Sequence, residues 1–274
     1  MKSATIIIRS RNDAKFARRT LEAIRSQSFQ NFKIICFDNA STDGTADILR
    51  EFGAEIINVP AGAYVPGKIL NMGVDAAKSD IVVFNNLDAV PQNDVWLENL
   101  IKPILSGEAQ IAYARQTARK DAYLWVARDY LNAFPDGEPC SEEFFSMASS
   151  AASAEVFKKL RFDESLKYSE DVMFAKTARK LGFKTAYASG AVAEHSHNYT
   201  AEEIARRFKG EGAADREILG GKFGAFKAIK RALSDILKDA LFAVKTGGIC
   251  GIPRAIVARI IQKKSYFLGR KVGA

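Results

Sequence analysis

Short runs of apolar residues alternate with amphipathic stretches through the first 115 residues of the chain. The runs are rich in β-branched residues, which is typical of buried strands. Strands are expected at residues 5–8, 33–37, 55–59, 81–84 and 110–114. Helical periodicity is expected in a stretch that ends near Gln27 and at residues 42–52, 68–77 and 94–105. This alternation predicts an α/β fold with a Rossmann-like, mostly parallel sheet that has helices on both faces.

The alternation breaks down after residue 115. Helices are expected at residues 118–134, 153–160, 169–181 and 200–219, and short strands at 185–188 and 191–193. Beyond Gly221 acidic residues nearly vanish, which is the clearest shift in composition along the chain. We therefore expect a body at residues 1–221, in two parts that meet near residue 115, and a helical extension at residues 222–274.

The charge of the chain is unevenly placed. Forty Lys and Arg against 32 Asp and Glu give a net charge of +8. The extension holds twelve basic residues and two acidic ones, Asp235 and Asp239, a net of +10, which leaves 28 basic and 30 acidic residues, a net of −2, in the body. Because the body has no excess of positive charge, a nucleic-acid partner is not expected.

Apolar residues recur every three or four positions along the extension, which predicts amphipathic helices. The first stripe comprises Phe223, Phe226, Ile229, Leu233, Ile236, Leu237, Leu241 and Val244. Lys and Arg flank it, as in helices that lie on an anionic membrane surface. Peripheral attachment to the cytoplasmic membrane is one interpretation; packing on the body, or on a second copy as a homodimer, is the other. Three widely spaced cysteines, without a paired motif, favour a reducing cytosol.

Polar residues follow three of the expected strands. Asn12, Asp38 and Asp88 each lie at or just after a strand end. Open α/β sheets bind ligands beyond the carboxyl ends of their strands, so these residues form a candidate site. Each also has a simpler interpretation, since Asp88 suits a turn, and Thr42 with Asp43 suits an Asx turn and a helix cap.

Two further pairs of residues suit catalysis or metal binding. Glu170 and Asp171 open a helix, whose dipole favours ionised carboxylates, as a general base requires; the same dipole makes acidic residues common there. His195 and His197 are the only histidines of the chain and point the same way if the segment is extended. They could bind a metal together with Asp88, or belong to a polar loop.

Basic residues near the expected site suit phosphate binding. Lys68 opens a helix where a cation is unfavourable unless an anion lies nearby, and Asn71 follows one turn later. The other candidates for phosphate contacts are Arg9, Arg11, Arg206 and Arg207. Ordinary solvation of a surface side chain is the alternative for each of them.

These motifs, in this order, resemble glycosyltransferase family 2, the inverting enzymes of the GT-A fold, over about residues 3–215. The motifs are residues 38–45, residues 67–73, residues 86–91 followed by Trp96-Leu97, Glu170-Asp171 and His195-Ser196-His197. Arg115-Gln116, Tyr199 and Arg206-Arg207 add a likeness to the rhamnosyltransferase branch. The resemblance implies a nucleotide-binding half at residues 1–115 and an acceptor and catalytic half at 116–221.

The resemblance implies a role for each matching residue. Asp38 would contact the base of a nucleoside diphosphate sugar, and Asp171, beside Glu170, would be the catalytic base. Asp88 would bind Mg2+ or Mn2+, with His195 or His197 as a further ligand or phosphate contact. The nucleotide-sugar pocket would be lined by Ser10, Arg11, Asn12, Lys68, Asn71, Asn86 and Leu87.

One residue departs from the family pattern. Asn86 stands where the first carboxylate of the Asp-x-Asp metal motif is expected, and a neutral amide oxygen is a weaker metal ligand. The expected activity is sugar transfer from a nucleoside diphosphate sugar, such as dTDP-rhamnose, to a glycan or lipid-linked acceptor of a bacterial surface polysaccharide. The alternatives are a membrane-associated protein that only binds the nucleotide sugar or glycan, and a sugar-phosphate nucleotidyltransferase. The second lacks support because residues 8–13 contain no glycine.

Overall fold

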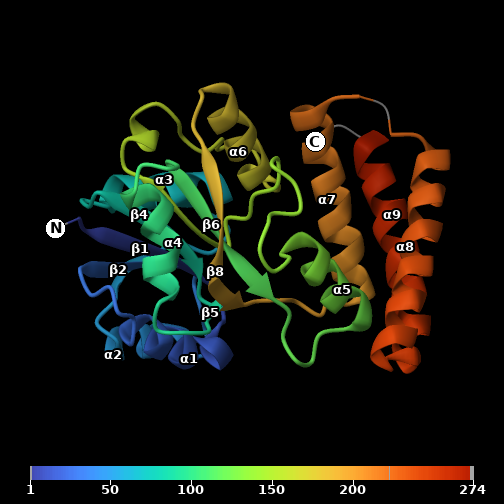
Figure 1. Ribbon diagram of the computed structural model, residues 1–274, viewed down its shortest axis with the longest axis horizontal. Helices are drawn as coiled ribbons and strands as arrows, with labels where there is room; N and C mark the ends of the chain where they lie inside the picture. Colours follow the sequence, from blue (N-terminus) through green and yellow to red (C-terminus); the bar gives the residue numbers. More distant parts are fainter. Residues whose placement is uncertain (1, 222, 272–274) are drawn as a thin grey trace. The chain divides into compact units, whose positions relative to one another are not determined.

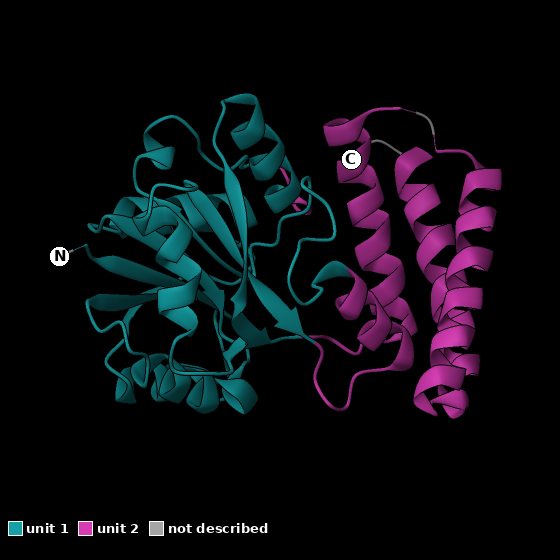
Figure 2. Cartoon of the chain, in the orientation of Figure 1, with its two compact units in different colours: residues 1–117, 133–165, 170–195 teal, residues 118–132, 166–169, 196–274 magenta. Residues whose placement is uncertain are grey.

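The computed structural model describes residues 2–221 and 223–271. Contacts divide the chain into two compact units (Figure 2). Unit 1 comprises residues 1–117, 133–165 and 170–195, and unit 2 comprises residues 118–132, 166–169 and 196–274. Lys222 and residues 272–274 of the expected extension lie outside the described residues.

Unit 1 is built on one mixed sheet whose strand order is β3-β2-β1-β4-β7-β6-β8-β5 (Figure 1). The strands are β1 (Ala4–Ser10), β2 (Phe32–Asp38), β3 (Glu55–Asn58), β4 (Ile81–Asn86), β5 (Val90–Pro91), β6 (Ile111–Thr117), β7 (Ser149–Ser153) and β8 (Thr185–Glu194). β1 pairs in parallel with β2 and β4, and β2 with β3, whereas β7 is antiparallel to β4 and β6. The expectation of an α/β fold with a mostly parallel sheet is confirmed.

Alternate residues of β1 face opposite sides of the sheet, and both sides are covered. Ile6 and Ile8 share a buried cluster with Leu21 and Trp96. On the other face, a Cβ atom on Gly73 would lie 2.7 Å from Cγ2 of Ile7, so helix and strand can approach this closely only because the residue is glycine. The helices of unit 1 are α1 (Ala14–Arg25), α2 (Thr45–Glu51), α3 (Pro66–Ala76), α4 (Trp96–Leu105) and α6 (Glu170–Lys180).

Several expected elements differ from the structure in the second half of the chain. The two short strands expected at 185–188 and 191–193 are one strand, β8, whose register along β6 shifts between Ala114 and Arg115. The helix expected at 153–160 is a 3-10 turn, Val156–Lys158, that follows β7. The helix expected at 118–134 begins at Leu124. β7 consists of Ser and Ala alone, so its apolar pattern is too weak to predict a strand.

Unit 2 is helical. It contains α7 (Ala201–Leu219), α8 (Ala225–Thr246), α9 (Ile252–Lys271), the 3-10 turn Ile249–Gly251 and nearly all of α5 (Leu124–Ala133). A Cβ atom on Gly212 would lie 2.3 Å from the backbone oxygen of Tyr266, and one on Gly269 would lie 2.0 Å from that of Lys209. These glycines let α7 and α9 pack backbone to backbone. The boundary expected near Gly221 therefore falls inside a compact unit, because α7 packs with the extension.

The interior of unit 2 contains charged side chains. Arg259 of α9 is 1% exposed and its Nε lies 2.7 Å from Oδ2 of Asp239, which is also 1% exposed. Arg259 Nη2 lies 2.7 Å from Oδ1 of Asp129, and Arg128 Nε lies 3.0 Å from Oδ1 of Asp239. Burial by itself lowers the pKa of Arg259, but hydrogen bonds to Asp129 and Asp239 raise it, and the net shift is upward. This network links α5, α8 and α9.

Candidate active site

Two predicted site residues, Asn86 at the end of β4 and Glu170 at the start of α6, contact Arg9 of β1. Arg9 and Asn86 are register partners on these parallel strands. Arg9 donates from Nη2 to Oδ1 of Asn86 over 3.1 Å, and from Nη1 to Oε1 of Glu170 over 3.2 Å and to the hydroxyl of Tyr64 over 3.3 Å. Burial by itself lowers the pKa of Arg9, but Tyr64, Glu170 and Asp171 raise it, and the net shift is upward. A permanent cation is thus fixed among these groups.

Glu170 and Asp171 lie in the first turn of α6, as expected. Arg9 occupies one oxygen of Glu170, whose side chain is only 13% exposed. Oδ1 of Asp171 accepts from the backbone N–H of Val172 over 2.9 Å. The amides of a helix first turn favour a carboxylate in its ionised form, which is the form a general base needs.

Asp38 lies at the end of β2 and is held by side chains on both sides. It is 3% exposed, accepts from Ser10 Oγ over 2.9 Å, and accepts from Ser41 Oγ over 2.6 Å. The Asn12 side chain accepts from the backbone N–H of Thr42 over 2.8 Å, which joins the ends of β1 and β2. Ser10, Asn12 and Asp38 therefore lie together at the ends of β1 and β2, and their role in nucleotide binding stays a prediction.

The capping role expected of Thr42 is wrong. Helix α2 has Gly44 as its N-cap, in the left-handed region at a φ of 90°. Asp43 accepts from Thr45 Oγ1 over 2.5 Å and from the backbone N–H of Ala14 over 2.9 Å, and the second bond ties α2 to the start of α1. Desolvation by itself raises the pKa of Asp43, but the hydrogen bonds from Thr45 and Ala14 lower it, and the net shift is downward. Thr42 contacts Asn12 instead, because Gly44 turns the chain away before the helix begins.

Asp88 and His195 form a buried pair. His195 Nε2 lies 3.5 Å from Oδ1 of Asp88, and both residues are 7% exposed. His195 Nδ1 lies 2.8 Å from Oε1 of Gln116, whose own Nε2 donates to Ser146 Oγ over 2.8 Å. When Gln116 presents Oε1 to the ring, Nδ1 of His195 donates to it, because an amide oxygen only accepts. In a neutral imidazole of this tautomer Nε2, on the side of Asp88, is the atom that can bind a metal.

The donor atoms near Asp88 fit a divalent cation. His197 follows His195 by two residues, and one ligand atom from each of Asp88, His195 and His197 lies within 4.8 Å of the others. One carboxylate and two imidazoles form a donor set that can bind a divalent transition-metal ion, and they suit Mg2+, which prefers oxygen ligands, less well. The prediction that these three residues lie together is met by the geometry, whereas the oxygen of Asn86 is bound by Arg9.

Other residues expected in the nucleotide-sugar pocket have structural contacts. Asn71 is 8% exposed; its amide donates to Phe162 O over 3.0 Å and to Glu164 Oε1 over 2.8 Å, and accepts from Phe162 N–H over 3.0 Å. Leu87 is fully buried in the core, so its side chain has no exposed surface to offer a ligand. Lys68 and Arg11 are exposed.

Two residues outside the expected pocket contribute to its order, Arg9 and Gln116. Arg9 was identifiable only as one of several candidates for phosphate contacts. Gln116 belongs to the Arg115-Gln116 motif, which indicates a family resemblance but no chemical role for Gln116. Their partners, Glu170 and His195, lie 161 and 79 positions away in the sequence.

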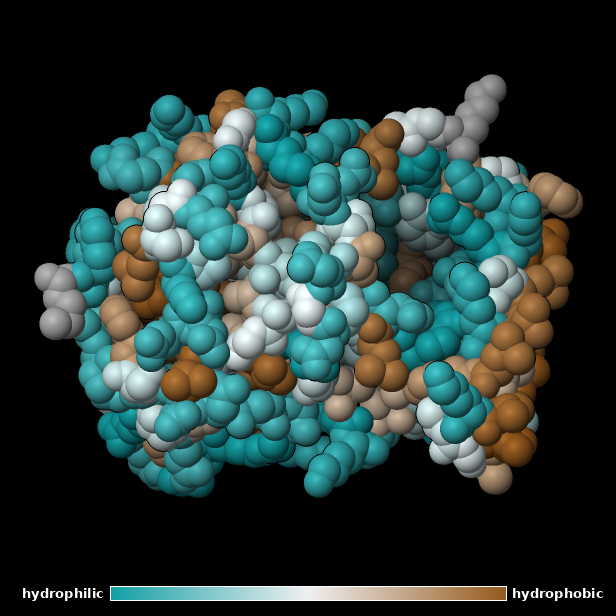
Figure 3. All heavy atoms as spheres, in the orientation of Figure 1, coloured by the Kyte–Doolittle hydropathy of each residue, from teal (hydrophilic) through white to brown (hydrophobic). Residues whose placement is uncertain are grey.

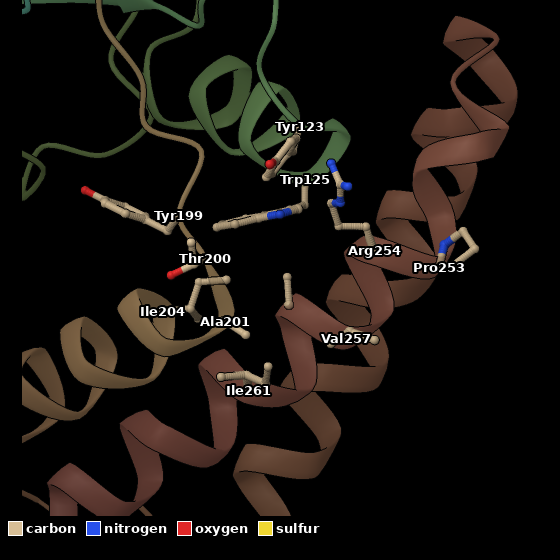
Figure 4. A pocket seen from close by; sticks show the side chains of 11 residues that line it. Tyr123, Trp125, Tyr199, Thr200, Ala201, Ile204, Pro253, Arg254, Val257 and Ile261 are labelled. Carbon is tan, nitrogen blue, oxygen red and sulfur yellow. The ribbon is translucent and has the colours of Figure 1, made fainter.

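Unit 2 contains a pocket of about 440 Å³ walled by Tyr123, Trp125 and Tyr199 (Figure 4). Arg254 lies over the Tyr123 ring, with its Cζ atom 4.3 Å from the centroid. Tyr199 stacks on His197 at a centroid distance of 5.2 Å. The volume is within the range of small-molecule sites, about 300–1,000 Å³. The remaining lining residues are Thr200, Ala201, Ile204, Pro253, Val257, Ala258 and Ile261.

Comparison with known proteins identifies relatives of this chain. Residues 5–167 match the family described as Glycosyl transferase family 2. The O-antigen chain rhamnosyltransferase RfbN of Salmonella typhimurium is 26% identical, over 97% of this chain and 89% of its own length. WbaN of Salmonella anatum, also an O-antigen chain rhamnosyltransferase, is 27% identical over 98% of this chain and 90% of its own length.

Solved structures share the fold. The mannosyltransferase PcManGT from Pyrobaculum calidifontis, in complex with GDP-Man and Mn2+, has a TM-score of 0.66 at 17% identity, covering 98% of this chain and 86% of its own. Glucosyl-3-phosphoglycerate synthase from Mycobacterium tuberculosis, with Mn2+ and UDP, has a TM-score of 0.59 at 20% identity, covering 81% of this chain and 82% of its own. The likeness identifies the fold as GT-A.

Proposed function

Because the chain belongs to glycosyltransferase family 2, we propose that it transfers a sugar, with inversion, from a nucleoside diphosphate sugar to a hydroxyl of a glycan or lipid-linked acceptor. Two relatives that match nearly the whole chain are O-antigen chain rhamnosyltransferases. They favour dTDP-rhamnose as the donor and a bacterial surface polysaccharide as the product. A lipid-linked acceptor is available only at a membrane, which favours a peripheral position on its cytoplasmic face.

In this proposal Asp171 accepts the proton of the acceptor hydroxyl. The hydroxyl oxygen forms a bond to the anomeric carbon while the bond to the nucleoside diphosphate breaks on the opposite face, and the diphosphate leaves with the electron pair. The ion pair with Arg9 keeps Glu170 in place beside Asp171 and leaves it less suited to accept the proton. Asp38, which accepts from Ser10 and Ser41, would accept an N–H of the nucleobase.

The observation that carries this proposal is the convergence of Asp88, His195 and His197, with Gln116 fixing the imidazole of His195. These residues would hold a divalent cation. Such a cation supplies positive charge that stabilises the leaving diphosphate. The arrangement makes the loss of the first motif carboxylate at Asn86 tolerable, because imidazole ligands replace it.

The aromatic pocket of unit 2 is our candidate for contacts with the acceptor. Rings such as Tyr123 offer a flat face to the apolar face of a sugar, and Arg254 adds a donor at the same ring. If this assignment is correct, Tyr123→Ala raises the KM for the acceptor without changing the KM for the donor. An unchanged acceptor KM would exclude the pocket.

A thermal-shift screen tests the donor. The folded protein is mixed with dTDP-rhamnose, GDP-mannose or UDP-glucose, each with and without Mn2+. The correct donor at about 100 times its Kd adds about 2.7 kcal/mol to the free energy of unfolding, and we expect this with dTDP-rhamnose and Mn2+. Donor hydrolysis is followed in the same samples: stabilisation without any hydrolysis or transfer would instead indicate a protein that only binds the nucleotide sugar.

A further inference from the structure

Helix α8 exposes its large apolar residues to solvent. Phe226 is 81% exposed and Val244 is 69% exposed, and between them Ile229, Leu233, Leu237 and Leu241 are 59–63% exposed. Their spacing of three or four residues puts all six on one side of the helix. Figure 3 shows hydrophobic side chains running along the edge where Figure 1 places α8. We name these six residues the α8 row.

Helices α8 and α9 bury small and polar side chains and leave large apolar ones in solvent. The residues that α8 buries are Ala228, Asp239 and Ala243. Those that α9 buries are Ala255, Ala258, Arg259, Gln262, Ser265 and Gly269. α8 and α9 therefore bury small and polar side chains, while α9 leaves Val257 and Ile260 more than half exposed. An apolar outer surface of this extent marks an interaction site.

The charge beside the α8 row is entirely positive. The five basic residues of α8, all exposed, are Lys227, Lys230, Arg231, Lys238 and Lys245. Its two acidic residues are turned to other helices, where Asp239 pairs with Arg259 over 2.7 Å and Asp235 pairs with Lys263 over 2.8 Å. The α8 surface therefore combines apolar contact area with uncompensated positive charge.

A groove of about 310 Å³ runs beside the row between α8 and α9. Ile229 and Leu233 belong both to the row and to the groove, so the two surfaces are continuous. The exposed Lys264 lies at the groove among otherwise apolar residues, and Lys263, also at the groove, is paired with Asp235. A hydrocarbon chain that ends in an anionic group matches this combination.

We propose that the α8 row and the adjoining groove attach the protein to the surface of an anionic lipid bilayer. None of the helices within residues 2–221 and 223–271 is long and apolar enough to cross a bilayer, so α8 lies in the interface with its row among the acyl chains and its lysines at the headgroups. A second copy of the chain is disfavoured as the occupant, because pairing two α8 surfaces would bring two sets of positive charges together. The exposed apolar and basic residues of α8 support this attachment whether or not the protein transfers a sugar.

Vesicle sedimentation tests the proposal with the full-length protein. Vesicles of phosphatidylcholine with 30% phosphatidylglycerol, about that fraction being enough for a negative surface potential, are compared with pure phosphatidylcholine. We expect binding to the anionic vesicles only. Leu233→Gln with Leu237→Gln weakens binding at least about tenfold, since it removes buried apolar area, and Lys230→Gln with Lys238→Gln weakens it in a salt-dependent way. All four positions are exposed, so the fold tolerates these changes.

The matched control is Leu105→Gln with Leu181→Gln, which makes the same change at two exposed leucines of unit 1, 47% and 50% exposed. This control should bind like the unchanged protein. Equal binding by the Leu233 and Leu237 variant, or equal binding to both kinds of vesicle, overturns the proposal. So does a dimer in light scattering that this variant converts to a monomer while neither protein binds vesicles, which would assign the surface to a second copy.

Discussion

Arg9 Nη1 donates to Oε1 of Glu170 over 3.2 Å, between the end of β1 and the first turn of α6. The same guanidinium holds Asn86, the residue that replaces a motif carboxylate. The guanidinium of Arg9 thus binds both Asn86, which replaces the motif carboxylate, and Glu170, one of the two candidate bases. This arrangement separates the roles of two neighbouring carboxylates that the sequence leaves equivalent.

The first prediction concerns the catalytic base. Asp171→Asn should lower kcat by about 10²–10⁴, the usual contribution of a positioned base, and leave the affinity for the donor nearly unchanged. Glu170→Gln should cost less, because an amide oxygen can still accept from Arg9. Steady-state kinetics and donor titration measure both. Full turnover by the Asp171 variant would show that another group accepts the proton.

The second prediction concerns the metal. Gln116→Leu removes the acceptor that fixes His195, so the affinity for Mn2+ should fall about 10–100-fold, as for other partners of ligand histidines. Isothermal titration of the protein with MnCl2 measures this directly. Gln110→Leu is a control in unit 1, since Gln110 accepts instead from the backbone of Lys184. Equal Mn2+ affinity in both variants would show that Gln116 does not support metal binding through His195.

The third prediction concerns the charged interior of unit 2. Asp239→Asn leaves Arg259 and Arg128 short of a buried anion, and breaking such a pair typically costs about 3–5 kcal/mol. Urea unfolding should therefore show a large loss of stability. Lys238→Gln also removes one charge, at the exposed position just before Asp239. It should change the free energy of unfolding by less than about 0.5 kcal/mol. Similar effects of the two changes would contradict the account of the network.

The fourth prediction concerns the thiols. Burial raises the pKa of Cys36 to about 12, while a hydrogen bond with Ser10 opposes the shift. At pH 8 Cys36 should not react with a thiol reagent in the folded protein, whereas the exposed Cys140 and Cys250 should. Because the pKa of Cys36 is higher in the folded chain than in the unfolded chain, the stabilisation that this thiol contributes is fully present below about pH 8.5, the ordinary thiol pKa. That contribution is lost as the pH rises through about 12. Labelling of three thiols without denaturant would contradict the burial.

Local sequence patterns were sufficient to predict the fold class and the main elements of unit 1. The apolar run at residues 81–84 lies in β4. Asp38 is the last residue of β2 and Asp88 follows the end of β4, as predicted. This works because strand periodicity and turn residues are local properties of the chain. β7 escaped prediction since five small residues carry no strong preference.

The contacts between distant groups became visible only in the folded chain. Glu170 meets Arg9 across 161 positions, and His195 meets Gln116 across 79, distances over which sequence patterns carry no pairing information. Sequence patterns also left open which residues of the helices in the extension face inward. An amphipathic repeat defines two faces, but not which residues turn inward. Here α8 buries Ala228, Asp239 and Ala243, and both its apolar row and its basic residues face solvent.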